Sequence, residues 1–345
     1  HTGKITKQGN KYLRWQGRRD EWLKYHKKRI KNREAELKFL LTRGRFSEMK
    51  IGLALGGGGA RGLFHIGVLK GLEKLKIKIS YIGGTSIGAV VGALYALYQD
   101  AEYVEKVALN ILEKYKKELA IFKNYTASSE VEERKLFLEK AYNFVKEFYL
   151  WNIKKIKFFL VSPSPFLKIF KELFDKKTFR DCKIPFLCST VDLKKGETLS
   201  LEEGTLLKAV LASSSVPGFF PPLKIKDKIL VDGGVLLPLP VTFLKKRVDF
   251  IIGVNLESEK ISSEEVKNIV EILFRVERIR YQKILEDILK GVDYLISLKD
   301  TSLKWTDFDK AKKLIDLGEK EILENQEKFI KILRRRFWRR IILGR

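Results

Sequence analysis

The sequence contains little cysteine and little histidine. Among 345 residues there are two cysteines, Cys182 and Cys188, and three histidines. Two cysteines cannot build a disulfide framework, and their spacing does not match a zinc-binding pattern. We therefore expect a protein of a reducing compartment.

The sequence also lacks a long apolar run. No stretch approaches the ~18 uninterrupted apolar residues that a spanning helix requires, and the start shows no secretory signal. The composition is otherwise that of a folded protein, with 45% hydrophobic and 11% aromatic residues, which excludes wholesale disorder. We expect a cytoplasmic protein that is not integral to a membrane.

Positive charge is in excess, and it gathers at the two ends of the chain. The formal net charge is +26. Residues 1–50 hold sixteen Lys and Arg against five Asp and Glu, and residues 331–345 hold seven against none. An anionic surface or polymer is the expected partner of such ends.

Hydrophobic periodicity predicts alternating strands and helices from about residue 49. Strands are expected at 49–55, 77–84, 184–193, 197–201, 226–234 and 249–256, with helices after the first two. This pattern is typical of an α/β fold with helices on both faces of a sheet.

The regions around this core are predicted to be helical. Residues 101–179 form a helical insertion, and residues 1–48 form a basic, mostly helical extension. An α/β domain is expected over 49–258. The chain from 259 to 345 reads as helices that end in a basic amphipathic one.

The stretch Leu55–Gly62, LGGGGARG, brings backbone N–H groups close to a ligand, because glycine has no side chain in the way. Gly57, Gly59 and Gly62 match the dinucleotide-binding pattern G-x-G-x-x-G. The next strand, however, ends in YIGGTSIG without the acidic residue that would hold a ribose. A P-loop is excluded because Leu63 follows Gly62, where that motif has lysine.

A second motif, G-x-S-x-G, spans Gly84 to Gly88 with Ser86 at its centre. It falls at a predicted turn from strand to helix, where flanking glycines allow a serine to take a strained, exposed conformation. The dipole of the following helix favours negative charge at that hydroxyl. A serine that merely caps the helix is the alternative interpretation.

A serine nucleophile needs a base, and histidine is poorly supplied. His1 and His26 lie in the basic extension, outside the predicted core. His65 lies one turn into the helix after the glycine loop, where a packed or capping role is favoured. A Ser-His-Asp triad is therefore not expected, and a carboxylate that acts directly remains.

Asp232 is the best candidate for that carboxylate. It ends the apolar strand ILVD and is followed at once by Gly233 and Gly234, which leaves room at the sheet edge. An aspartate in a tight turn is the alternative. Asp192 and Asp249 compete with it, but neither has a following glycine pair.

Attack by a serine on an ester creates an oxyanion that needs preorganised donors. Backbone N–H groups around Gly57, Gly58 and Gly59 are the predicted donors. Arg61 is grouped with them, because it would orient the loop or add positive charge. A structural salt bridge is the alternative for Arg61.

The three motifs together resemble the patatin-like phospholipase family. The resemblance rests on the glycine loop, on G-x-S-x-G and on Asp-Gly-Gly, and it covers about 50–256. It implies a three-layer α/β hydrolase that uses a Ser-Asp dyad without histidine, metal or other cofactor. The residues that carry the motifs are Gly57, Gly58, Gly59, Arg61, Gly62, Gly84, Ser86, Gly88, Asp232, Gly233 and Gly234.

Carried over to this sequence, the resemblance implies that Ser86 is the nucleophile, Asp232 the general base, and the glycine loop the oxyanion hole. The expected function is hydrolysis of carboxylic esters of phospholipids or acylglycerols. An acyltransferase or thioesterase with the same dyad is the alternative among enzymes. A catalytically silent adaptor that binds membrane or nucleic acid is the alternative outside enzymes.

The last predicted helix, FIKILRRRFWRRIILGR, places Ile330, Leu333, Phe337 and Ile341 on one face with arginines around it. This is typical of a helix at a lipid interface, so we expect peripheral binding to the inner face of a membrane. A terminal helix packed on the domain is the alternative. No nucleic-acid-binding motif is present, so nucleic acid is not the expected partner.

Overall fold

The computed structural model describes residues 49–123, 163–257, 265–266 and 269–343. The chain divides into two units, residues 1–49 and 50–345. The predicted N-terminal extension over 1–48 lies outside the described residues, as do residues 124–162 of the predicted insertion.

The second unit contains an eight-stranded sheet. Its strands, in chain order, are β1 (Ile51–Leu55), β2 (Tyr81–Gly84), β3 (Phe186–Asp192), β4 (Glu197–Leu201), β5 (Leu223–Ile225), β6 (Lys228–Asp232), β7 (Phe250–Asn255) and β8 (Tyr294–Ser297). Hydrogen-bonded neighbours follow the order β5-β6-β3-β2-β1-β7-β8, and β4 also pairs with β3. Strands β3, β2, β1, β7 and β8 run parallel, whereas β4, β5 and β6 join by antiparallel pairs.

The pairing of β3 brings the ends of β2 and β6 together. Thr190 of β3 pairs with β4 on one edge and with Asp232 of β6 on the other. Cys188 likewise pairs with β4 on one edge and with Gly84 of β2 on the other. Since β4 occupies the same edge throughout, β2 and β6 share the opposite edge. Their last residues therefore lie two positions apart along β3, or roughly 7 Å.

Helices and 3₁₀ turns connect these strands. In chain order they are η2 (Gly59–Gly62), α2 (Leu63–Lys74), α3 (Ile87–Tyr98), α4 (Ala101–Lys114), α5 (Lys116–Lys123), α7 (Pro163–Phe174), η4 (Phe179–Asp181), α8 (Leu206–Ser213), η5 (Gly233–Val235), α9 (Val241–Leu244), α10 (Ile269–Leu289), η6 (Phe308–Lys310), α11 (Ala311–Glu324) and α12 (Gln326–Leu343). The described parts of the predicted insertion are thus α4, α5, α7 and η4.

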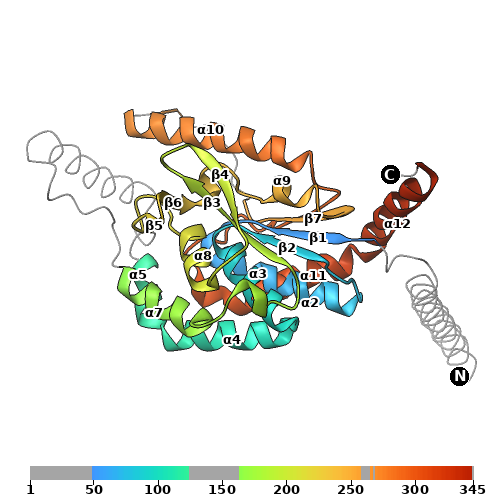
Figure 1. Ribbon diagram of the computed structural model, residues 1–345, viewed down its shortest axis with the longest axis horizontal. Coiled ribbons are helices and arrows are strands. Elements are labelled where there is room, and N and C mark those ends of the chain that lie inside the picture. Colours follow the sequence, from blue (N-terminus) through green and yellow to red (C-terminus); the bar gives the residue numbers. More distant parts are fainter. Residues whose placement is uncertain (1–48, 124–162, 258–264, 267–268, 344–345) are drawn as a thin grey trace, which may run out of the picture. The chain divides into compact units, whose positions relative to one another are not determined.

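Helices cover both faces of the sheet (Figure 1). On one face Leu244 of α9 and Leu285 of α10 pack against Leu187 and Ile251 of the strands. On the other face α3 lies so close to the sheet that a Cβ on Gly92 would come within 3.0 Å of the Phe186 ring. The predicted α/β class, with helices on both faces of a sheet, is confirmed.

The sequence predicted helices throughout the chain beyond Glu257, and the structure differs from this prediction. Residues 294–297 form β8, which pairs in parallel with β7 and completes the sheet. Its four residues are too few to show a clear alternation. The C-terminal residues therefore contribute to the same sheet as the motif-bearing strands.

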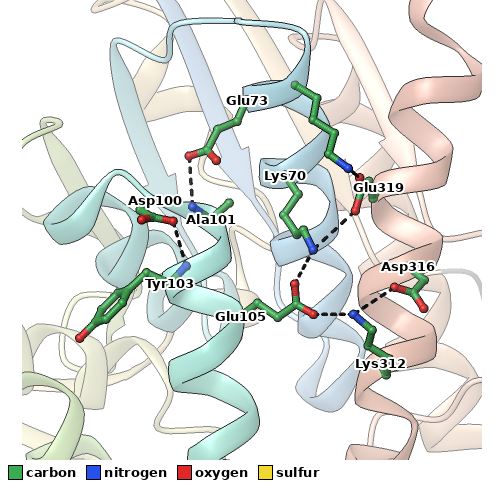
Figure 2. A network of polar contacts seen from close by, with 10 residues as sticks. Lys70, Glu73, Asp100, Ala101, Tyr103, Glu105, Lys312, Asp316 and Glu319 are labelled. Carbon is green, nitrogen blue, oxygen red and sulfur yellow. Dashed lines mark hydrogen bonds and ion pairs between the residues drawn. The ribbon is translucent and has the colours of Figure 1, made fainter.

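A network of ion pairs joins the C-terminal helix α11 to two helices of the core (Figure 2). Glu105 of α4 accepts hydrogen bonds from Lys70 of α2 at 2.5 Å and from Lys312 of α11 at 2.7 Å. Lys70 also lies 3.7 Å from Glu319, and Lys312 lies 3.6 Å from Asp316. Helix α2, which follows the glycine loop, is thereby held from both sides.

The final helix α12 packs its apolar face on the protein. Ile330, Leu333 and Phe337 are buried, so the prediction that they face a lipid interface is wrong for these three residues. Trp338 is 57% exposed, and the side chain of Ile341 lies outside the described residues. Among the described helices, none is both long and apolar enough to cross a membrane.

Candidate active site

Ser86 lies in the tight turn between β2 and α3. Its backbone adopts φ 55° and ψ −123°, a conformation that costs energy for any residue with a side chain. The backbone N–H of Ser86 donates to Oγ of Ser213 at 3.0 Å. The side chain makes no capping hydrogen bond to α3, so the capping interpretation is wrong. The turn thus presents a strained serine whose hydroxyl is not used by the helix.

Thr85 connects this turn to neighbouring segments by hydrogen bonds. Its N–H donates to the carbonyl of Leu55 at 3.0 Å. Its hydroxyl donates to the carbonyl of Leu237 at 3.1 Å and lies 2.6 Å from Oγ of Ser189. Because a hydroxyl has one hydrogen and a carbonyl only accepts, Ser189 donates to Thr85. The position of Ser86 is therefore fixed by buried hydrogen bonds on both sides of the strand end.

The motif glycines allow close backbone contacts around the turn. A Cβ on Gly88 would overlap the carbonyl of Leu55, and a Cβ on Gly84 would overlap Gly88 and Ala89. A Cβ on Gly62 would overlap the side chain of Ile87, the first residue of α3. The first turn of α3 consequently packs directly against the end of β1 and the glycine loop.

Asp232 ends β6 and is buried, with 4% of its surface exposed. Its N–H donates to the carbonyl of Ser215 at 3.0 Å, and its Oδ1 accepts the N–H of Gly234 at 2.7 Å. A Cβ on Gly233 would overlap Ser189, so this glycine lets the chain turn tightly over β3. The two glycines that follow Asp232 therefore orient its carboxyl group.

The structure brings Ser86 and Asp232 together. Burial raises the pKa of Asp232 to about 6, while hydrogen bonding by the Ser86 side chain and by the N–H of Gly234 acts in the opposite direction. Oδ2 of Asp232 is buried and completes no close hydrogen bond with any described residue. The site holds a carboxylate with free accepting capacity beside a hydroxyl group.

The competing residues lie in other settings. The carboxyl of Asp192 accepts the N–H of Lys194 in the following turn and the N–H of Ile229 in the neighbouring strand β6, so its contacts are structural. Asp249 precedes β7, at the opposite end of the parallel strands, and accepts the N–H of Lys50.

His65 is fully buried in α2 and takes a packing role, as the sequence favoured. Its Nε2 lies 2.8 Å from the carbonyl of Gly56, which only accepts, so Nε2 carries the hydrogen. Burial lowers the pKa of His65 to about 4, so the ring is neutral near pH 7. The histidine holds the start of the glycine loop.

The glycine loop lies against Ser86. A Cβ on Gly57 would be 3.4 Å from Cβ of Ser86. The N–H of Gly57 donates to the carbonyl of Pro238 at 3.3 Å, which corrects the prediction that all three glycines offer free donors. Gly58 and Gly59 have positive φ values of 155° and 57°, and neither N–H donates to another described residue. The uncommitted donors are therefore those of Gly58 and Gly59.

Arg61 connects the glycine loop to Glu257. Its Nε donates to the carbonyl of Gly58 at 3.4 Å, and its guanidinium lies 3.6 Å from the carboxylate of Glu257. The side chain is buried, and Glu257 also binds Arg278 of α10 at 3.0 Å. These contacts bear out the structural salt bridge, and the contact with Gly58 agrees with the loop-orienting role expected of Arg61.

Sequence reasoning gave no role to Ser213 and Ser215. They lie in the segment ASSSVPGFFPP, where Ser213 binds the N–H of Ser86 and Ser215 binds the N–H of Asp232. This one segment thus sets the spacing between the two residues. The run of three serines was the available signal, but serine runs are common in loops and carry no pairing information.

The described residues contain no candidate metal site. Among them, no three His, Cys, Asp or Glu side chains lie close enough together to hold a metal ion. The chemistry that this arrangement allows is proton transfer between Ser86 and Asp232, with negative charge accepted by backbone N–H groups.

Comparison with known protein families and with curated relatives points to one family. The family model "Patatin-like phospholipase" matches residues 53–245. Lysophospholipase NTE1 of Pyricularia oryzae is 32% identical over 209 residues, which are 60% of this chain and 12% of that protein. Patatin-like phospholipase domain-containing protein 6 of Mus musculus is 33% identical over 192 residues, which are 55% of this chain and 12% of that protein. The chain spans only a small part of the length of these relatives.

Solved structures with a similar arrangement include two bacterial proteins. VipD from Legionella pneumophila has a TM-score of 0.40 and 14% identity, over 81% of this chain and 67% of that one. ExoU from Pseudomonas aeruginosa, solved with SpcU, has a TM-score of 0.35 and 14% identity, over 81% of this chain and 52% of that one.

The family model covers more than half of the chain and includes the glycine loop, Ser86 and Asp232. This chain therefore belongs to the patatin-like phospholipase family, whose members are lipid ester hydrolases.

Proposed function

We propose that this protein hydrolyses carboxylic esters of phospholipids or related acylglycerols through an acyl-enzyme on Ser86. The observation that carries the proposal is the meeting of Ser86 with the buried carboxyl of Asp232 at the facing ends of β2 and β6. The strained turn and the two uncommitted N–H groups beside it support the same chemistry.

In the first step Asp232 acts as the general base. With a pKa of about 6 it is about nine-tenths ionised at pH 7, and it is a stronger base than an exposed aspartate. It takes the proton of the Ser86 hydroxyl as Oγ bonds to the ester carbonyl carbon. The protonated Asp232 then gives this proton to the departing alcohol as the ester C–O bond breaks.

Negative charge on the former carbonyl oxygen is stabilised by the glycine loop. The N–H groups of Gly58 and Gly59 are the proposed donors, because they lie in the loop that contacts Ser86 and have no described acceptor of their own. The N-terminus of α3 adds favourable potential at Ser86.

The second step regenerates the enzyme. Asp232 removes a proton from water, and the hydroxide oxygen bonds to the acyl carbon as the bond to Oγ of Ser86 breaks. Ser86 regains the proton and the fatty acid leaves. The same two side chains therefore serve both half-reactions, and no other catalytic base is required.

A lipid surface is the proposed location of the substrate. The net charge of +26 favours approach to anionic lipid, although the buried face of α12 removes the amphipathic contact that the sequence suggested there. Vesicles that contain an anionic phospholipid are therefore the appropriate bulk substrate, and their turnover should fall as salt is added.

The test compares the wild-type protein with Ser86→Ala and Ser80→Ala. Turnover of p-nitrophenyl butyrate and of anionic vesicles should fall by ~10⁴-fold or more in Ser86→Ala. A fluorophosphonate probe should label the wild type but not this variant. Ser80→Ala is a matched control, since that hydroxyl accepts the N–H of Ile51 at the other end of the strands. Wild-type turnover by folded Ser86→Ala would refute the proposal.

A further inference from the structure

An aromatic side chain from outside the family-matched residues lies on the glycine loop. Trp305 follows β8, well beyond residue 245 where the family match ends. Its carbonyl accepts the N–H of Ala60 at 2.7 Å. Its ring atom Cε3 lies 3.2 Å from the position that a Cβ on Gly59 would take. The indole of Trp305 therefore contacts one of the two proposed oxyanion donors.

A second aromatic side chain, that of Phe219, packs against Trp305. The ring of Phe219 lies 5.3 Å from the Trp305 ring in an edge-to-face arrangement. Phe219 belongs to the segment whose Ser213 and Ser215 bind the backbones of Ser86 and Asp232. The two rings are consequently carried by the same segments that hold the catalytic groups.

The apolar surface continues from these rings toward the helices between β2 and β3. Phe220 packs edge-to-face on Phe166 of α7, with 4.9 Å between the ring centres. Phe166 belongs to a buried cluster with Ile111, Leu119 and Ile169, from α4, α5 and α7. Phe219, Phe220 and Trp305 border this cluster and stay half-buried.

The loop that carries the phenylalanines begins with two exposed residues. These are Pro217 and Gly218, and a Cβ on Gly218 would have no atom of a described residue within 4 Å. The N–H groups of Phe219 and Phe220 both donate to the carbonyl of Val216, at 3.1 and 2.9 Å. This turn fixes the backbone of both phenylalanines, in the segment that also binds the backbones of Ser86 and Asp232.

We propose that Trp305 and Phe219 form the wall along which the substrate's acyl chain lies. The inference rests on the proposed function, because it takes the ester carbonyl to sit between Ser86 and the glycine loop. From that point an acyl chain meets the indole of Trp305 first, then Phe219, and then the cluster of α4, α5 and α7. Large, rigid aromatic rings bury apolar area efficiently, which suits them to an alkyl chain.

The wall sets a preference for long acyl chains. Each methylene fully removed from water favours binding by ~fourfold, so several methylenes on the wall add a large factor. Interaction with the chain positions the carbonyl as well, so the preference should appear in kcat/KM. Trp305 comes from outside the family-matched residues, so the chain-length preference should depend on this chain as well as on the family's motifs.

The test measures a ratio, kcat/KM for p-nitrophenyl laurate over kcat/KM for p-nitrophenyl butyrate, in wild type, Trp305→Ala and Phe219→Ala. The ratio should fall by ~10-fold in each variant. Trp305→Phe should restore most of it, because an aromatic ring remains. The backbone contact from residue 305 to Ala60 is kept in these variants. A ratio is insensitive to the fraction of protein that folds, since both esters see the same active molecules.

Trp338→Ala is the matched control, because that tryptophan is exposed on α12 at the other end of the parallel strands. It should leave the ratio unchanged. An unchanged laurate-to-butyrate ratio in Trp305→Ala and Phe219→Ala would refute the proposal that these rings form the acyl-chain wall. Failure of the catalytic proposal gives a different result, namely butyrate turnover that survives Ser86→Ala.

Discussion

The polar groups at the two ends of the parallel strands differ in how completely they are hydrogen-bonded. At the end where β7 and β8 begin, the carboxyl of Asp249 accepts the N–H of Lys50 at 2.8 Å, and that of Asp293 accepts the N–H of Ile251 at 2.8 Å. Arg336 of α12 lies 3.4 Å from Asp293. The acids at this end have partners that hold the strands in register.

The same end is also closed by aromatic packing. Phe329 of α12 is fully buried, and its ring lies 4.7 Å from Tyr294 of β8 and 6.5 Å from Phe250 of β7. The apolar face of α12 therefore covers the start of the sheet, and its function is to stabilise the fold.

The other end keeps groups that would be more stable in another arrangement. Ser86 has a positive φ, Oδ2 of Asp232 is buried beside it and completes no close hydrogen bond with a described residue, and the N–H groups of Gly58 and Gly59 have no described acceptor. At this end the strain and the unmet hydrogen bonds lie where a reacting substrate would satisfy them. Variants at the two ends should consequently have opposite effects on activity and stability.

The largest effect among these variants should come from Asp232→Asn. Loss of the general base should lower kcat/KM by ~10²- to 10⁴-fold. Stability should change in the other direction. Because burial raises the pKa of Asp232 from its usual value near 4 to about 6, the wild type loses stability as pH rises through that interval. The variant should lack this loss, which chemical denaturation at pH 4 and pH 7 would measure.

Asp192→Asn is the matched control for this variant. Asp192 is also buried, but its carboxyl accepts the backbone N–H groups of Lys194 and of Ile229 in β6. Its kcat/KM should stay within ~2-fold of the wild type, since it takes no part in proton transfer. Equal losses of activity in both variants would remove the distinction between the two aspartates.

Phe329→Ala at the packed end should have the opposite effect, a loss of stability without a loss of activity. Removal of a fully buried ring should lower the free energy of unfolding by about 3–5 kcal/mol. Ester turnover per folded molecule should be unchanged, because the ring lies at the far end of the strands from Ser86. Denaturant unfolding and an active-site titration would measure the two quantities. Trp338→Ala, a change of an exposed residue on the same helix, should stay within about 0.5 kcal/mol.

Local patterns made the position of Ser86 and Asp232 predictable. A strand, glycine and helix pattern places Ser86 in a tight turn, and an apolar run before Asp-Gly-Gly places Asp232 at a strand end. Both features depend on residues next to one another in the chain. The meeting of the two residues depends on the antiparallel pairing of β6 with β3, a contact between distant segments that no local pattern specifies.

Hydrogen-bond partners were not predictable from the sequence. The commitment of the Gly57 N–H to Pro238 and the contact of Ser213 with Ser86 both join segments far apart in the chain. The amphipathic pattern of α12 likewise indicates an apolar face but not what covers it. From the sequence, we expected lipid to contact this face. In the structure, its described apolar residues pack against the start of the sheet instead.

The pH dependence of kcat/KM for p-nitrophenyl butyrate tests the central claim most directly, namely that a buried aspartate is the base. The base must be ionised, so the rate should rise with pH, reach half its maximum near the Asp232 pKa of about 6, and level off above it. Below that midpoint it should fall tenfold for each pH unit. A rate that is constant from pH 5 to pH 8, or a midpoint that stays in place in Asp232→Asn, would contradict the account.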